Sequence, residues 1–158
     1  MRVAVAGTFG PIHDGHRALF REALERGDDG VVVGVSSDRF ARESRRPDPR
    51  PIPPYDERER RVEATLAALD EWGREVIVRK FTDEYGFADD DPTLDALVVS
   101  PETDDAVAEI NRRREERGLD PLEPIVVPYE YAADGERISS TRIVEGEIDE
   151  HGNVLDPE

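Results

Sequence analysis

The most regular feature of the chain is a series of five short apolar runs rich in valine and isoleucine. Apolar residues follow one another in these runs instead of alternating with polar ones. Continuous runs of this kind are typical of parallel strands that are covered on both faces. The runs predicted as strands are Arg2–Ala6, Val31–Ser36, Glu75–Phe81, Ala96–Ser100 and Pro124–Tyr129.

Longer amphipathic segments separate the apolar runs and are predicted as helices. The second of them carries an apolar stripe that ends with Leu66, Leu69 and Trp72, and we expect Leu66 and Trp72 to lie in the core. Each segment stops at a glycine, which is a common helix end. The strand–helix alternation predicts a single α/β domain with a Rossmann-like, doubly wound, five-stranded parallel sheet. The predicted helices are His16–Arg26, Asp56–Trp72 and a third that opens with Ser100-Pro101-Glu102 and runs to Arg117.

Two segments interrupt this alternation. The stretch Pro47–Pro54 is too rich in proline for a helix or a central strand, so it is predicted as an extended surface loop. Asp83–Pro92 is predicted as an acidic loop. In a chain of this composition we interpret the carboxylates of Asp89–Asp91 as solvated side chains and not as a metal site.

The length of 158 residues fits one domain and leaves little room for a second. We place that domain at residues 1–146. Residues 147–158 are predicted to form a polar, loosely held tail in which His151 has no expected role. The absence of cysteine excludes disulfides, thiolate zinc sites and cysteine nucleophiles. No apolar run reaches the length of a membrane span, so we expect a soluble cytoplasmic protein.

The charge of the chain is strongly unbalanced. Asp and Glu number 38 against 21 Lys and Arg, which gives a formal net charge of −17. Non-specific nucleic-acid binding needs a basic face, so this class of partner is excluded. Lys80 is the only lysine. An acid-rich, lysine-poor composition resembles that of proteins from salt-loving organisms, in which salt screens the repulsion between carboxylates.

The strongest chemical signal lies where the first predicted strand ends. The loop Gly7–His16 contains two of the three histidines, His13 and His16, and two glycines, Gly7 and Gly15, where backbone can approach a ligand closely. Ligands of parallel α/β sheets bind beyond the carboxyl ends of strands, and helix N-termini attract anions. The loop therefore favours phosphate binding over a purely structural turn, although it matches no Walker A or GxGxxG pattern. Two histidines without a third ligand make a poor zinc site.

A second motif, Arg137–Ile143 (RISSTRI), follows the fifth predicted strand. Serine and threonine directly before an apolar-periodic segment are typical of a helix N-cap, which would explain the motif taken alone. Its position also places the motif at the carboxyl edge of the sheet, where backbone N–H groups and hydroxyls can bind a second phosphate. Both interpretations stay open at this point.

The two motifs together carry a resemblance to a known family. GTFGPIHDGH resembles the GTFDxxHxGH signature of the HxGH nucleotidyltransferase superfamily, and ISSTRI resembles its second signature, which binds the nucleotide triphosphate. Between them, VVSPET followed by EINRRREERGL is similar to the archaeal phosphopantetheine adenylyltransferases. The resemblance covers nearly the whole chain. It has one departure, because Gly10 stands where the family usually has aspartate.

This resemblance implies an enzyme of coenzyme A biosynthesis that transfers AMP from ATP to 4′-phosphopantetheine, giving dephospho-coenzyme A and pyrophosphate. The attacking phosphate is already an anion, so the reaction needs neither a general base nor a covalent intermediate. Positioning and charge stabilisation would carry catalysis. Mg²⁺ is the expected cofactor. It would neutralise the polyphosphate while held by substrate oxygens and water, with no metal site in the protein itself.

The resemblance also implies a role for individual residues. His16 and Thr8 are the expected catalytic residues: His16 would stabilise charge at the α-phosphate, and Thr8 would bind or orient the acceptor phosphate. Arg39 and Arg42, with Thr8, are the expected substrate-binding residues. Bacterial relatives use a lysine after the second strand, and this chain has only arginines as basic residues there. The residues expected to bind ATP are Gly7, Phe9, His13, Gly15, His16, Ser139, Ser140 and Thr141.

Two alternative functions stay open. A sister enzyme of the same superfamily would use another acceptor, namely nicotinamide mononucleotide, FMN or glycerol phosphate. The other alternative is an inactive nucleotide-binding module, for which Gly10 is the motive, although both histidines and the Ser-Ser-Thr segment argue for activity. Glu102 follows the fourth strand and either contacts the ribose or only complements the dipole of its helix. The sequence leaves the oligomeric state open.

Overall fold

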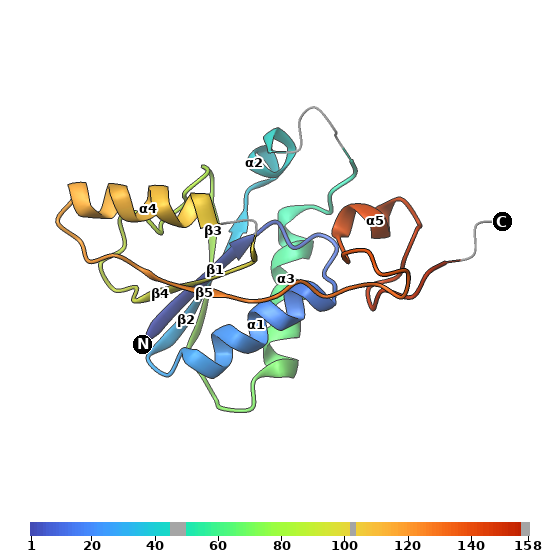
Figure 1. Cartoon of the computed structure of the whole chain (residues 1–158), viewed down its shortest axis with the longest axis horizontal. Coiled ribbons are helices and arrows are strands. Elements are labelled where there is room, and N and C mark those ends of the chain that lie inside the picture. The colour runs from blue at the N-terminus through green and yellow to red at the C-terminus, as the bar shows by residue number, and fades with distance from the viewer. Residues whose placement is uncertain (45–49, 102–103, 156–158) are drawn as a thin grey trace.

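Five parallel strands form one sheet with helices on both sides (Figure 1). The computed structural model describes residues 1–44, 50–101 and 104–155. The strand order is β3-β2-β1-β4-β5, and every neighbouring pair is parallel, which confirms the predicted doubly wound α/β fold. The strands are β1 (Arg2–Gly7), β2 (Gly30–Ser36), β3 (Val76–Phe81), β4 (Ala96–Val99) and β5 (Glu123–Val126). The helices are α1 (Asp14–Arg26), α2 (Asp38–Glu43), α3 (Tyr55–Leu69), α4 (Asp104–Glu116) and α5 (Ser140–Val144).

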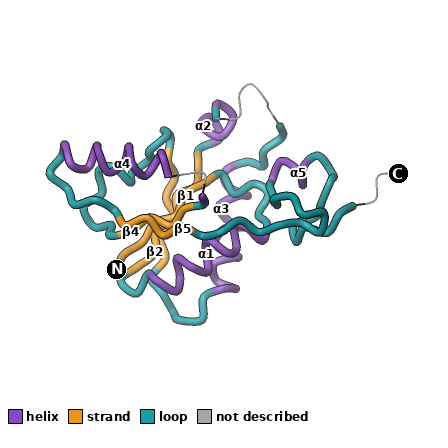
Figure 2. Tube along the Cα trace, viewed as in Figure 1, coloured by secondary structure: helices purple, strands orange, loops and turns teal. Residues whose placement is uncertain are grey.

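The apolar runs of β1, β2 and β4 are continuous because both faces of the sheet are covered there. The edge strands β3 and β5 leave Ile77 and Val126 exposed, so the prediction of full cover is wrong for these two strands. On one face, Val3 of β1 belongs to the same core cluster as Phe20 of α1 and Val62 of α3. On the other face, Ala4 of β1 belongs to a second cluster with Ile110 of α4. Figure 2 shows the strands at the centre with the helices around them. Successive side chains of one strand therefore enter two different cores, and neither can be polar.

The second long helix ends earlier than predicted. Helix α3 covers Tyr55–Leu69, whereas the apolar spacing predicted Asp56–Trp72. The Asp70 carboxylate accepts hydrogen bonds of 2.9, 3.0 and 2.9 Å from three backbone N–H groups that follow it, which turns the chain off the helix axis. Trp72 lies beyond this turn and is 39% exposed, so its prediction as a core residue is wrong, while Leu66 is buried as predicted.

Other boundaries differ in smaller ways. Helix α1 begins at Asp14, two residues before the predicted start. Helix α2 was not predicted; Ser37 caps it by accepting a hydrogen bond from the N–H of Phe40 at 3.1 Å. The described part of the proline-rich loop, residues 50–54, has no regular secondary structure before α3 begins. Glu102, at the predicted start of the third helix, lies outside the described residues. Over the described ranges, no helix is long and apolar enough to cross a membrane.

The acidic loop between β3 and β4 is less solvated than predicted. Asp89 is 7% exposed. Its carboxylate pairs with Arg117 at 3.0 Å and with Arg113 at 3.5 Å, both from the end of α4. Arg114 is 1% exposed and donates to two carbonyl oxygens of this loop at 2.9 and 2.8 Å. The prediction of a fully solvated loop is therefore wrong at Asp89, because neighbouring arginines pair with its charge.

The segment after α5 packs against the domain. Ile148 is completely buried, and the carbonyl oxygen of Glu150 accepts a hydrogen bond from the N–H of Asp14 at 3.0 Å. His151 Nδ1 lies 3.1 Å from a carboxylate oxygen of Asp14. The prediction of a loosely held tail is thus wrong for Ile148, which packs in a small apolar cluster, and for Glu150 and His151, which contact Asp14 at the beginning of α1.

A fully buried arginine ties together the ends of β1 and β2. Arg58 of α3 donates to the carbonyl oxygens of Thr8, Ser36 and Pro53 at 3.0, 2.8 and 2.8 Å. Its charge is paired with Asp38 at 2.9 Å. Because Thr8 follows β1 and Ser36 ends β2, this side chain fixes the carboxyl edge of the sheet.

We expect Arg58→Met to lower the free energy of unfolding by about 3 kcal/mol, because it leaves three carbonyl oxygens and a carboxylate without their donor. Arg60→Met is the matched control, since Arg60 is exposed on the same helix and should change stability by less than about 0.5 kcal/mol. Urea unfolding of the two variants measures the difference. Equal stabilities would show that Arg58 does not hold this edge.

Candidate active site

Both sequence motifs open onto one cavity at the carboxyl edge of the sheet. The cavity has a volume of about 500 Å³ and is reached from the ends of β1, β4 and β5. Strands β1 and β4 are neighbours at the point where the strand order reverses, which is where open α/β sheets bind ligands. Its lining includes all the residues predicted to bind ATP, together with Thr8: Gly7, Phe9, His13, Gly15, His16, Ser139, Ser140 and Thr141.

The two histidines of the first motif are held by hydrogen bonds within the loop. Nδ1 of His13 accepts the N–H of Gly15 at 3.0 Å, and Nδ1 of His16 accepts the N–H of His13 at 3.3 Å. The two rings stack with their centroids 3.8 Å apart. Because each Nδ1 is an acceptor, the proton of each neutral ring lies on Nε2. Both rings therefore present an Nε2–H donor to a ligand.

Both histidines are held in the neutral form. Burial is the main cause that lowers the pKa of His13 from 6.5 to about 4, and the charge of Arg17 adds to it. Burial also lowers the pKa of His16 well below its usual value, with further contributions from His13, Arg17 and Arg50. At neutral pH these rings act as hydrogen-bond donors without a net charge.

The low pKa of His13 makes stability depend on pH. Below about pH 6.5 the unfolded chain takes up a proton on this residue that the folded chain binds only near pH 4. Stability is therefore present above pH 6.5 and is lost as the pH falls towards 4. We expect His13→Asn, which does not titrate, to lose less stability than the wild type between pH 7 and pH 5. Urea unfolding at both pH values tests this, and an identical loss in the two proteins would contradict it.

The ring of Phe9 restricts the orientation of the His16 ring. Phe9 has a positive φ of 52° and is 2% exposed. Its ring meets the His16 ring edge-on at 5.0 Å and the Phe20 ring at 4.9 Å. A buried aromatic ring in this position restricts the imidazole of His16, so that its Nε2–H points in a fixed direction.

At the first turn of α1, fewer backbone N–H groups are available to bind an anion than the position of this turn suggests. The N–H of Asp14 donates to Glu150, and the N–H of Gly15 donates to His13 at 3.0 Å. Anion contacts at this turn therefore fall mainly to the side chains of His13 and His16. The sequence identified the turn, but not that the segment after α5 occupies part of it.

Residues of the second motif both cap helix α5 and line the cavity. Ser139 caps α5 by accepting a hydrogen bond from the N–H of Arg142 at 3.2 Å. The Ser140 hydroxyl donates to the carbonyl oxygen of Pro11 at 2.6 Å, which joins the two motifs directly. The structure confirms the N-cap at Ser139, and Ser139, Ser140 and Thr141 also line the cavity, while phosphate binding by these residues stays a prediction.

Arg50 reaches the cavity from the proline-rich loop. Its guanidinium donates to the carbonyl oxygen of Gly10 at 2.9 Å and to the Thr141 hydroxyl at 3.2 Å. Arg39 is on the exposed side of α2, where it pairs with Glu43 at 3.0 Å, and neither it nor Arg42 lines the cavity. The sequence predicts Arg39 and Arg42 as substrate-binding residues and not Arg50. The only available signal was its place just before the prolines that lead into α3.

A second, apolar cavity adjoins the first. It has a volume of about 260 Å³ and is lined mainly by residues of β4, α4 and the β3–β4 loop, with Phe40, Phe81 and Phe87 among them. Gly7, Thr8 and Ser100 line both cavities. The Thr8 hydroxyl is 2.9 Å from the Ser36 hydroxyl, which orients it. Thr8 therefore stands between a polar cavity and an apolar one.

Gly10 is a close-packed position. A Cβ there would lie 2.8 Å from Cδ of Arg58 and 3.1 Å from Cδ of Pro53. The absence of a side chain leaves room for Arg58, whose carboxylate partner is Asp38. The departure from the family pattern at this position therefore coincides with a buried arginine and leaves both histidines in place.

The protein offers few ligands to a metal ion in either cavity. Among the residues that the structure describes, Glu130 is the only carboxylate that lines the polar cavity, and Glu84 is the only one that lines the apolar cavity. The Nδ1 atoms of both histidines already accept hydrogen bonds. Within the described part of the chain, no group of three or more His, Cys, Asp or Glu residues is placed to hold a metal.

Comparison with known proteins supplies the family. The model of a family described as cytidylyltransferase-like matches residues 4–146, which include both motifs. The chain belongs to the cytidylyltransferase-like family. A phosphopantetheine adenylyltransferase of Methanopyrus kandleri is 42% identical over 149 residues, which cover 94% of this chain and 91% of the relative. A phosphopantetheine adenylyltransferase of Archaeoglobus fulgidus is 38% identical over 159 residues, which cover 98% and 100%. These relatives confirm the resemblance to the archaeal phosphopantetheine adenylyltransferases.

A solved structure of the cytidylyltransferase-like fold agrees with this assignment. The crystal structure of a protein with unknown function from Archaeoglobus fulgidus matches with a TM-score of 0.70 and 35% sequence identity. The match covers 80% of this chain and 89% of that one. The likeness therefore extends from the sequence to the three-dimensional arrangement of the family.

Proposed function

We propose that this protein transfers the adenylyl group of ATP to 4′-phosphopantetheine, releasing pyrophosphate and forming dephospho-coenzyme A. The observation that carries this proposal is the junction of two unlike cavities at Thr8, one lined by histidines and hydroxyls and the other by apolar side chains. A triphosphate and an acceptor with a long uncharged arm would meet at this residue. The names of the archaeal relatives support the same pair of substrates.

The polar cavity has the donors that a triphosphate needs. His13 and His16 supply Nε2–H groups, Arg50 supplies a guanidinium that contacts the Thr141 hydroxyl, and Ser139 adds a further hydroxyl to the lining. Charge-assisted hydrogen bonds from arginine to phosphate are stronger than neutral ones. We therefore assign Arg50, which sequence reasoning did not select, to the triphosphate.

Catalysis would consist of positioning and charge stabilisation. An oxygen of the acceptor phosphate attacks the α-phosphorus, and the bond from the α-phosphorus to the β-bridging oxygen breaks, so that pyrophosphate leaves with the electron pair. Thr8, oriented by Ser36, would hold the acceptor phosphate. The Nε2–H of His16 would donate to the α-phosphate, where negative charge is redistributed in the transition state. Since the acceptor is an anion, no proton has to be removed.

Mg²⁺ is expected to enter as part of the nucleotide substrate. Within the described part of the chain, the carboxylates that line the two cavities are too few for a protein cage, whereas magnesium commonly keeps several waters and binds through substrate phosphates. When bound, the ion would neutralise charge on the polyphosphate. The side chains of the protein would bind and orient that polyphosphate.

We assign the cytoplasm as the site of action, because both substrates are metabolites of that compartment. We also assign a salt-rich solvent as the condition in which the protein works. The second assignment rests on the net charge of −17 and the single lysine. A surface with this excess of carboxylates repels itself unless salt screens it.

A pyrophosphate-release assay tests the function. ATP or CTP is offered in high KCl with 4′-phosphopantetheine, nicotinamide mononucleotide, FMN or glycerol 3-phosphate, and products are identified by mass. We expect release only with ATP and 4′-phosphopantetheine, with dephospho-coenzyme A as the second product. Preference for another acceptor would identify a sister enzyme. ATP binding without release in any mixture would identify an inactive nucleotide-binding module.

A further inference from the structure

We propose that Asp89, Arg113 and Arg117 form a clamp that positions Tyr85 in the wall of the apolar cavity and thereby sets the affinity for the acceptor. This inference rests on the proposed function, because it takes the apolar cavity as the acceptor site. It assigns a role to charged residues that lie outside both cavities. The three members of the clamp are positioning residues and are not expected to touch either substrate.

The wall in question is the loop between β3 and β4. Residues 84–88 of this loop line the apolar cavity. The loop contains turns and no strand or helix, so backbone ladders do not hold it. Its inner part is anchored by Arg114, which donates to the carbonyl oxygens of Ala88 and Asp91 at 2.9 and 2.8 Å. Arg114 therefore fixes the base of the loop, and other contacts must fix the part that faces the cavity.

Those contacts come from Arg113 of α4 and from Arg117, which directly follows this helix. Arg113 places its guanidinium over the ring of Tyr85, 4.1 Å from the centroid. The same guanidinium is 3.5 Å from the carboxylate of Asp89. Arg117 pairs with that carboxylate at 3.0 Å and also donates to the carbonyl oxygen of Asp89 at 3.0 Å. Tyr85, which lines the cavity, is thus linked through Arg113 to a buried carboxylate held from two sides.

The interaction energies of these contacts favour one fixed position of Tyr85 relative to α4. A cation over an aromatic ring contributes about 0.5–2 kcal/mol, with the larger value for desolvated pairs. Asp89 is 7% exposed, so loss of either arginine would leave a buried carboxylate with one partner fewer. Phe87, which lines the same cavity, has a similar partner on β3: the Arg79 guanidinium lies 4.2 Å from its ring centroid. Two aromatic residues of the wall are therefore each covered by an arginine.

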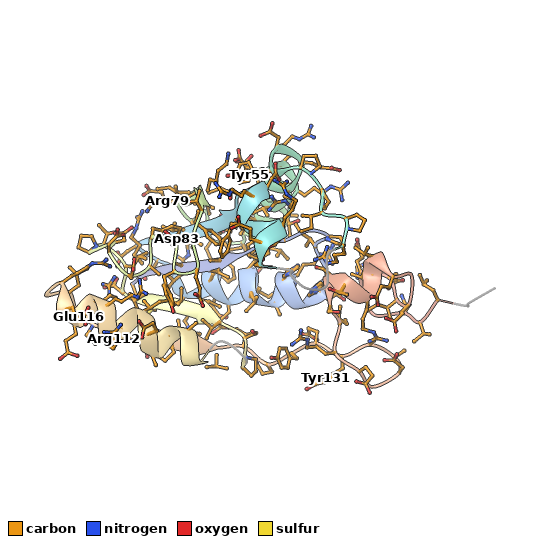
Figure 3. The ribbon with its side chains drawn as sticks, turned by 90° about the horizontal axis from the view of Figure 1, so that it is seen from above. Tyr55, Arg79, Asp83, Arg112, Glu116 and Tyr131 are labelled. Carbon is orange, nitrogen blue, oxygen red and sulfur yellow. The ribbon has the colours of Figure 1, made fainter. Side chains whose placement is uncertain are left out.

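The same helix provides a matched control. Arg112 and Glu116 project together from the end of α4 (Figure 3). Arg112 is exposed and pairs with Glu109 at 2.5 Å and with Glu116 at 2.6 Å. It has the same side chain on the same helix as Arg113 and shares the Glu109 carboxylate, which lies 3.1 Å from Arg113, but its own ion pairs lie within the helix and do not reach the loop.

The experiment compares Arg113→Gln, Arg113→Lys and Arg112→Gln in the full-length protein. We expect Arg113→Gln to raise KM for 4′-phosphopantetheine about 5- to 10-fold, with KM for ATP and kcat within about twofold, since the triphosphate cavity is untouched. Arg113→Lys keeps the charge and should recover part of the affinity. Arg112→Gln should match the wild type. A merely structural role would instead change both KM values or the amount of folded protein.

Tyr85→Leu gives a second route to the same answer. It should raise KM for the acceptor by itself, and Arg113→Gln should add little in the double variant, because the two residues act through one contact. Full additivity of the two changes, or equal effects of Arg113→Gln on both KM values, would overturn the clamp. A wild type that releases pyrophosphate with other acceptors but not with 4′-phosphopantetheine would overturn the proposed function, and the clamp with it.

Discussion

Replacing His16 by alanine should lower turnover by at least about 100-fold while ATP still binds. The expected size is that of losing one donor to charge that develops in a transition state. The His16 ring is held by Phe9 at 5.0 Å and by the N–H of His13 at 3.3 Å, so its Nε2–H has a fixed direction before substrate arrives. A donor of this kind contributes mainly to kcat, whereas His13, Arg50 and the hydroxyl motif would still hold the triphosphate.

Two further variants separate the chemistry of His16 from its part in the loop. His16→Asn keeps an acceptor near the position of Nδ1, so the hydrogen bond from the N–H of His13 can form, but it has no donor at the position of Nε2. His16→Gln places an amide donor near Nε2. We expect the asparagine variant to be as slow as alanine and the glutamine variant to recover part of kcat. Single-turnover rates and ATP affinity by calorimetry measure both quantities. Near wild-type turnover in His16→Asn would contradict the assigned role.

The sheet and the position of the two motifs at its carboxyl edge could be predicted from the sequence, because the patterns that indicate them are local. The five strands follow short apolar runs, the first motif directly follows β1, and the second comes after β5 and a connecting loop. In a parallel sheet the carboxyl ends of these strands share one edge, so adjacency of His16 and Ser139 follows from topology. The cavity that both residues line agrees with this inference.

Contacts that depend on the path of a loop could not be predicted in this way. Arg50 reaches Gly10 and Thr141 only because the proline-rich loop returns across the edge of the sheet. Trp72 continues the apolar period of its helix, but Asp70 ends the helix first. A local pattern contains no information on which of several arginines a loop brings to a site. It also does not show whether a carboxylate such as that of Asp70 ends a helix before the next apolar residue of the pattern is reached.

Buried charges were the second class of difference. In a chain with 38 acidic residues, the composition predicts that Asp89 is solvated. The structure buries Asp89, Arg58 and Arg114 instead. Each is buried with partners from distant segments: carbonyl oxygens for the two arginines, and arginines for Asp89. Burial of a charge depends on such partners, and they become visible only in three dimensions.

High salt should raise the melting temperature by about 10 °C between 0.1 and 3 M KCl, which corresponds to roughly 3 kcal/mol for a domain of this size. Folding concentrates a net charge of −17 in a compact volume. Arg114 is buried and donates to carbonyl oxygens, so it does little to offset carboxylates on the surface. Repulsion between those carboxylates acts against the folded state, and salt screens it.

The shape of the salt dependence distinguishes screening from a general effect of concentrated salt. The Debye length falls from about 10 Å at 0.1 M to about 3 Å at 1 M, so screening is nearly complete by 1 M. Most of the rise should therefore occur below 1 M, whereas preferential exclusion of salt would continue to stabilise the protein steadily up to 3 M. Turnover is followed in the same series. Screening weakens the attraction of ATP to Arg50 but also relieves its repulsion from the acidic remainder, and we expect the gain in folded protein to dominate. A melting temperature that is flat or falling between 0.1 and 1 M would contradict adaptation to salt and would leave the enzymatic assignment intact, because that assignment rests on the cavities and the relatives and not on the surface charge.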